Sequence, residues 1–173
     1  PFTANLIRKF AQFLVSICAA LIVVDHVQDR NNLERLVCVI LIVGIAAAVL
    51  GLVLYLIPAD LSERFLNALG RIGYPLGSVL RYIEDNPANA QRAIGTSVDP
   101  NSLGGLLAMI GALAAPQLVA SKPLLRPRWL TWIAFALIVV TLILSFSRAA
   151  MISLGVTILG IALLRYRRLV WLV

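Results

Sequence analysis

Long apolar runs separated by short polar stretches dominate this chain. Five runs are expected to form helical membrane spans, at about residues 6–24, 36–57, 103–120, 130–146 and 149–164. About 20 consecutive apolar residues in a helix are needed to cross the hydrocarbon core of a bilayer. The pattern therefore predicts an all-α fold, a polytopic bundle of transmembrane helices with an exterior loop over residues 58–102.

Both ends of the chain suggest that it is part of a longer protein. It begins at Pro1 rather than at a methionine, and Trp171-Leu172-Val173 has the character of the start of a sixth span. We therefore expect residues 1–173 to form one membrane domain that is a fragment of a larger one.

Arg148 is the only charged residue in the 35 residues from Leu130 to Leu164. A single helix of that length would measure about 52 Å, whereas the hydrocarbon core is about 30 Å thick. A break at Ser145–Arg148 instead divides the run into a helical hairpin with the guanidinium at one membrane face. An ionisable group there indicates a functional site. The alternative is an arginine that reaches the lipid headgroups.

Composition and charge place this hairpin in a multi-pass membrane protein. Hydrophobic residues make up 61% of the chain, charged residues 13%, and the mean hydropathy is +0.94. The net charge of +7 comes from clusters between spans, which is typical of loops facing anionic lipid and not of nucleic-acid binding.

The basic residues are unevenly distributed between the two sides of the membrane. Three inter-span segments carry eight basic residues in 24 positions, and residues 58–102 carry four in 45. By the positive-inside rule this long loop and Arg148 face the exterior of the cytoplasmic membrane. Arg8 and Lys9 oppose that orientation, which earlier spans could set.

The exterior loop is predicted to contain two short amphipathic helices at the membrane interface. Asp60 and Glu63 resemble a capping box, and the apolar face that follows ends at Gly70. A second piece is expected over about residues 76–83. Such helices would either admit a lipid-borne substrate laterally or scaffold the loop.

The segment from Arg92 to Asn101 predicts a helix start with anion-binding character. Asp99 is a suitable N-cap and Pro100 a suitable first helical residue, so the free N–H groups of the third span should face the exterior. Helix N-termini attract anions, and the planar fork of Arg92 suits phosphate oxygens. Gly104 and Gly105 would keep side-chain bulk away. With Arg148 on the same face, these groups indicate a site for a lipid-linked phosphate or pyrophosphate, although Asp-Pro-Asn is also common in ordinary helix starts.

Two motifs together resemble the O-antigen ligase and polymerase superfamily, which are multi-span glycosyltransferases of the bacterial envelope. The motifs are Arg92-x-x-Gly95-Thr96-x-x-Asp99-Pro100-Asn101 and Leu144-Ser-Phe-Ser147-Arg148-Ala149-Ala150. The resemblance is strongest over about residues 92–168, and the two preceding spans are compatible with it in length and placement. Ala149 stands where the family often has glycine and Ser97 where it often has an aromatic residue, so the subfamily stays open.

The resemblance implies that Arg92 and Arg148 bind the pyrophosphate of a polyprenyl diphosphate-linked glycan donor. Asn101 and Ser147 of the same motifs are expected to be further substrate-binding residues. The acceptor would be a glycan, a lipid or a protein, and neither a metal nor a cofactor is expected. The resemblance also implies an exterior histidine, further along the chain, that activates the acceptor hydroxyl. The only histidine here, His26, is expected in a solvated cytoplasmic loop, so the activating residue would lie beyond this chain. The fragment alone is then expected to be inactive.

Two alternatives remain open at this stage. Arg148 could be a substrate or gating charge in a transporter or channel, whose cores often contain broken helices. It could also contact lipid headgroups in a purely structural membrane scaffold.

Overall fold

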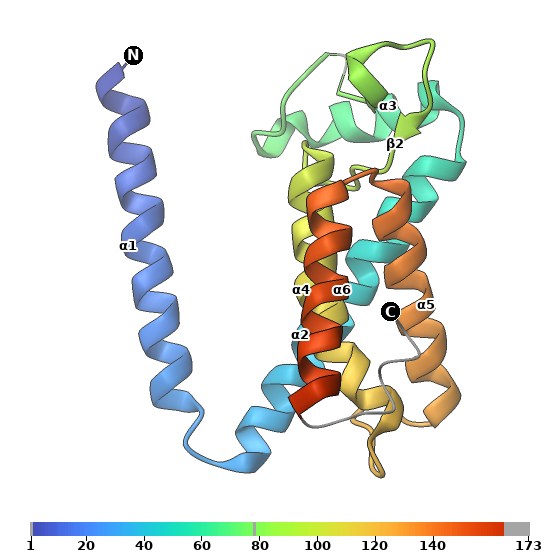
Figure 1. Cartoon of the computed structure of the whole chain (residues 1–173). Coiled ribbons are helices and arrows are strands. Elements are labelled where there is room, and N and C mark those ends of the chain that lie inside the picture. The colour runs from blue at the N-terminus through green and yellow to red at the C-terminus, as the bar shows by residue number, and fades with distance from the viewer. Residues whose placement is uncertain (1, 78, 165–173) are drawn as a thin grey trace. The chain divides into compact units, whose positions relative to one another are not determined.

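The computed structural model describes residues 2–77 and 79–164, and this part of the chain is mostly helical (Figure 1). It contains six α-helices, two short 3₁₀ helices and two short strands. In chain order these elements are α1 Phe2–His26, α2 Arg30–Leu56, α3 Ala59–Ala68, η1 Leu69–Ile72, β1 Arg81–Tyr82, η2 Ile83–Asp85, β2 Gln91–Arg92, α4 Pro100–Val119, α5 Arg128–Leu144 and α6 Arg148–Leu164.

Three of these helices, α1, α2 and α4, are long and apolar enough to cross a membrane. Helices α5 and α6 are apolar but have 17 residues each. The five predicted spans therefore coincide with helices, and the membrane-spanning length is confirmed for three of them. The predicted start of a sixth span lies outside the described residues.

The chain divides into two units, residues 1–37 and 38–173. In the first unit, residues Val27–Asp29 form the turn between α1 and the first turns of α2. The Asn32 side-chain amide donates a hydrogen bond of 3.2 Å to the His26 carbonyl, and Arg30 pairs with Glu34 at 2.9 Å. His26 is the exposed last residue of α1, so the prediction that it lies in a loop was wrong, and the helix extends about two residues beyond the predicted span.

Close helix packing builds the core of the second unit. Helix α4 packs extensively against both α5 and α6, and α2 presents its small residues Gly44, Ala48 and Gly51 to this group. A Cβ atom at Gly44 would collide with Ile110 of α4, and one at Gly51 would lie 2.9 Å from Thr141 of α5. The Thr141 hydroxyl also donates to the Ala48 carbonyl at 3.1 Å. These small residues thus allow the helices to approach closely.

Two predicted boundaries of the helices are confirmed by their local chemistry. Asp99 is the N-cap of α4, its carboxylate accepts from the Ser102 N–H at 2.8 Å, and Pro100 begins the helix. Between α5 and α6 the chain turns at Phe146, whose φ of 52° is left-handed, and α6 begins at Arg148. The expected hairpin break therefore falls where the only charge of the apolar run lies.

The long loop differs from its prediction. Helix α3 begins after Pro58 without a side-chain cap, so the predicted capping box was wrong. The buried Ser62 hydroxyl donates to the Leu54 carbonyl at 2.6 Å, which attaches α3 to the end of α2. The helical path continues past Gly70 through η1 and ends at Gly73, whose φ is 87°.

The second predicted amphipathic helix, at residues 76–83, was also wrong. The segment leads into β1, which pairs antiparallel with β2 in the register Arg81 to Arg92. Val79 and Leu80, which are consecutive, are both buried in a cluster with Leu54, Leu66 and Ile94. The pairing of Arg81 and Tyr82 with β2 replaces the hydrogen bonds that a helix would have made there.

Tyr74 packs against the same apolar cluster. Its hydroxyl is buried and has no hydrogen-bond partner in the described part of the chain, although the Val98 backbone and Arg81 lie nearby. Burial raises the pKa of Tyr74, and these two neighbours oppose the rise.

Candidate functional site

Arg92 is fixed by hydrogen bonds at the C-terminus of α5. The Ala93 N–H donates to the Leu144 carbonyl at 2.8 Å, which attaches the end of β2 to the helix. The Arg92 guanidinium donates from Nε to the Ser145 carbonyl at 2.9 Å and from Nη2 to Asn101 Oδ1 at 3.1 Å, with a longer 3.4 Å contact to the Phe146 carbonyl. Carbonyls at a helix C-terminus lack intrahelical partners and carry partial negative charge. Arg92 therefore satisfies the end of α5 as well as facing the site.

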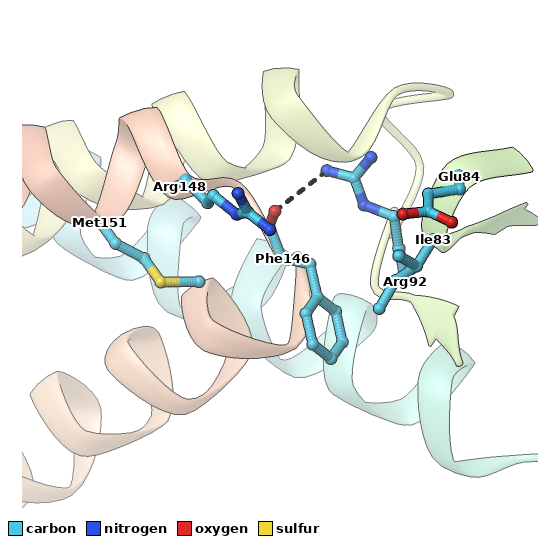
Figure 2. Close-up of a pocket in the computed structure, with 6 residues that line it drawn as sticks. All are labelled: Ile83, Glu84, Arg92, Phe146, Arg148 and Met151. Atoms are coloured by element: carbon cyan, nitrogen blue, oxygen red, sulfur yellow. Dashed lines mark hydrogen bonds between the residues drawn. The ribbon is translucent and has the colours of Figure 1, made fainter. Parts of the chain in front are cut away.

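Arg148, the first residue of α6, is exposed. It lines a cavity of about 150 Å³ together with Ile83, Glu84, Arg92, Phe146 and Met151. Figure 2 shows Arg92 and Arg148 on either side of the Phe146 carbonyl, with Glu84 beside Arg92. Within residues 2–77 and 79–164, the Arg148 side chain has neither a hydrogen bond nor an ion pair. A cation at a helix N-terminus opposes the helix dipole, so Arg148 is not placed there to stabilise α6.

Glu84 is a cavity-lining residue that the sequence reasoning missed. It and Asp85 both have left-handed backbones, with φ of 58° and 52°, and such a value is uncommon for a glutamate. No ion pair within 4.0 Å joins Glu84 to a cation in the described part of the chain. In the sequence Glu84 is one of two acidic residues before Asn86-Pro87, a pattern that is typical of a loop and carries no signal of a site. The cavity thus combines two guanidinium groups with one carboxylate.

The other two predicted site residues do not line this cavity. Asn101 accepts the hydrogen bond from Arg92 and so holds that side chain in place. Ser147 is buried, 3% exposed, and packs beside α4 at Gly104. A Cβ atom at Gly104 would lie 2.7 Å from the Ser147 Cβ, so this glycine allows the turn between α5 and α6 to approach α4 closely.

The N-terminus of α4 is not open to an anion in the way we expected. The Asp99 carboxylate occupies it by accepting from both the N–H and the hydroxyl of Ser102, at 2.8 and 3.1 Å. Pro100 has no N–H to offer. The positive character of the site therefore comes from the two arginines at the turn between α5 and α6.

The size and chemistry of the cavity suit a small polyatomic anion. Its volume of about 150 Å³ corresponds to roughly five water molecules at about 30 Å³ each. Guanidinium groups donate paired, charge-assisted hydrogen bonds to phosphate and carboxylate oxygens. Within the described part of the chain, no group of three or more His, Cys, Asp or Glu residues is arranged to hold a metal ion.

Comparisons with models of protein families, with curated proteins and with solved structures find no match for this chain. The fold and the site define a mostly helical protein in which three helices can span a membrane. At one end of its α4–α6 helices, two arginines line a common cavity.

Proposed function

We propose that the chain is part of an O-antigen ligase-like glycosyltransferase. The enzyme would transfer or polymerise a glycan from a polyprenyl diphosphate-linked donor at the outer face of the cytoplasmic membrane. The observation that carries the proposal is that Arg92 and Arg148 line the same cavity although 56 positions separate them in sequence. These are the arginines of the two motifs that resemble the superfamily.

The geometry suits binding of the donor pyrophosphate. Arg148 has donors that are free of partners in the described residues, and Arg92 is held rigidly by three protein acceptors. When the glycosidic bond to the diphosphate breaks, negative charge develops on the departing group. The Arg92 guanidinium is already held by its protein acceptors and can stabilise that charge without reorganising, and Arg148 adds donors that are free to bind the departing group.

The same proposal assigns the remaining roles. The acceptor hydroxyl belongs to a glycan, a lipid or a protein, and its proton is taken by a residue outside the described cavity. The rival function is a transporter or channel in which Arg148 is a substrate or gating charge. The hairpin break at Arg148 is compatible with it, because transporter sites often lie at interrupted helices.

Lipid binding by the reconstituted protein tests the proposal. We expect the protein to bind a polyprenyl diphosphate at least about tenfold more tightly than the matching polyprenyl alcohol, a difference of about 1.4 kcal/mol. Arg148→Ala should remove this preference. Arg126→Ala, a change of an exposed arginine beyond the other end of α4, should retain it. Equal binding of the two lipids by the unmodified protein would refute the proposal, and transport of the diphosphate lipid without glycan transfer would favour the rival.

A further inference from the structure

An apolar groove lies between α5 and α6. Both helices pack on α4, yet they contact one another only sparingly. The space between them is a groove of about 250 Å³, lined by Phe135, Leu142 and Ile143 of α5 and by Met151, Leu154 and Ile158 of α6. The groove residues carry no charge, so a hydrocarbon chain fits it better than a polar ligand does.

The groove adjoins the arginine cavity. Met151 lines both spaces, and Arg148, Met151, Gly155 and Ile158 follow one another at helical spacing on one face of α6. The ten positions from Arg148 to Ile158 correspond to about 15 Å of helix. A cationic end and an apolar continuation are thus aligned along a single helix face.

We propose that this groove holds the first isoprene units of the donor lipid while its diphosphate lies at Arg148. The inference rests on the proposed function and adds the place of the hydrocarbon chain to it. Bulk lipid is as apolar as the groove, so the gain on entering comes from close packing and from alignment of the scissile bond. The cationic cavity at the end of the groove selects a chain that carries an anionic headgroup.

Two glycines of α6 provide a matched pair of variants. A Cβ atom at Gly155 or at Gly160 would meet no heavy atom within 4 Å, so both positions have room for a larger side chain. Gly155 lines the groove, and Gly160 lines neither the groove nor the arginine cavity. Leucine at either position changes helix propensity equally, and only Gly155→Leu places bulk in the groove.

The test compares a long-chain polyprenyl diphosphate with inorganic pyrophosphate, which has no chain. Gly155→Leu should weaken binding of the lipid at least about fivefold, because overfilling a packed site is unfavourable, and should leave pyrophosphate binding unchanged. Gly160→Leu should bind both probes as the unmodified protein does. Equal behaviour of the two variants would overturn the inference, as expected if another helix fills the groove.

The remaining outcomes separate the groove from the headgroup site. Binding of pyrophosphate with no gain from the long chain would overturn the groove and leave the proposed function standing. Binding of neither probe would overturn both.

A second measurement needs no substitution. A diphosphate lipid with a photoreactive group on its first isoprene unit should crosslink to Met151 and Ile158. Crosslinking instead to Ile152 and Val156, which lie on the exposed face of α6 and are 67% and 64% exposed, would place the chain in bulk lipid and contradict the inference.

Discussion

Two arginines of the same cavity differ in what surrounds them. Arg92 donates to two backbone carbonyls and to Asn101, whereas the described structure offers Arg148 no partner. Charge-assisted hydrogen bonds that satisfy buried carbonyls stabilise a fold, and an unpartnered arginine at a helix N-terminus does not. Loss of function on replacing Arg92 would therefore be ambiguous, and Arg148 is the better probe of ligand binding.

This difference predicts that replacing Arg92 destabilises the protein and that replacing Arg148 does not. Arg92→Ala should lower the free energy of unfolding by about 1–3 kcal/mol, because it leaves the carbonyls at the end of α5 without donors. Arg148→Ala should leave it within about 0.5 kcal/mol of the original value. Thermal unfolding of the two variants in the same detergent is the measurement. Equal destabilisation would show that Arg148 also supports the fold.

The carboxylate of Glu84 should weaken anion binding. Glu84→Gln removes a negative charge from the cavity wall and should raise the affinity for inorganic pyrophosphate by roughly twofold to fivefold at low salt. Asp85→Asn is the matched control, since Asp85 is adjacent, has the same charge and left-handed backbone, and does not line the cavity. A titration followed by calorimetry measures both. An equal gain in the control would indicate a long-range charge effect and not a contact in the cavity.

At the scale of elements, local chemistry predicted two helix boundaries, whereas burial against distant elements determines the path of the long loop. Asp99 with Pro100 predicted the start of α4, and the polar residues around Arg148 predicted the break between α5 and α6. The loop from residue 58 to 102 was predicted less well. Its path depends on burial of Val79 and Leu80 against α2 and α3, which are distant in sequence and cannot be seen in local periodicity.

Adjacent glycines at the start of α4 should respond differently to the same substitution. A Cβ atom at Gly104 meets Ser147 at 2.7 Å, whereas one at Gly105 meets nothing within 4 Å. Gly104→Ala should therefore destabilise the protein by about 1–3 kcal/mol. Gly105→Ala should be neutral or stabilising by up to about 1 kcal/mol through helix propensity. Denaturation curves of both variants decide the matter, and equal stability would show that the turn between α5 and α6 does not press against α4.

At the scale of the whole molecule, the sequence located part of the site. The sequence pointed to Arg92 and Arg148. We expected the two arginines to lie close together because α4, α5 and α6 are joined by short connections. It did not find Glu84 or the groove between α5 and α6. Both depend on how separate elements diverge and approach in space, and neither the left-handed backbone at Glu84 nor the gap beside Gly155 leaves a sequence pattern.

The orientation in the membrane remains a prediction from the distribution of basic residues. With Cys18 and Cys38 replaced, Ala88→Cys in the long loop should react with a membrane-impermeant thiol reagent from outside. Ser121→Cys, beyond the C-terminal end of α4, should react only after the membrane is opened. Both of these positions are exposed, so access to the reagent depends on the side of the membrane. Reaction of both from outside would contradict the topology and the exterior location of the donor site.

Glycan transfer by Arg148→Lys in the full-length protein tests the central claim most directly. Lysine keeps the charge and loses the planar pair of donors, so headgroup contact would survive this change and oriented pyrophosphate binding would not. We predict that turnover from a polyprenyl diphosphate-linked donor in reconstituted membranes falls roughly 100-fold or more, nearly as far as for Arg148→Ala, at equal protein abundance. Transfer near the original rate by the lysine variant would show that a positive charge alone suffices at the cavity, and would contradict the proposed donor site.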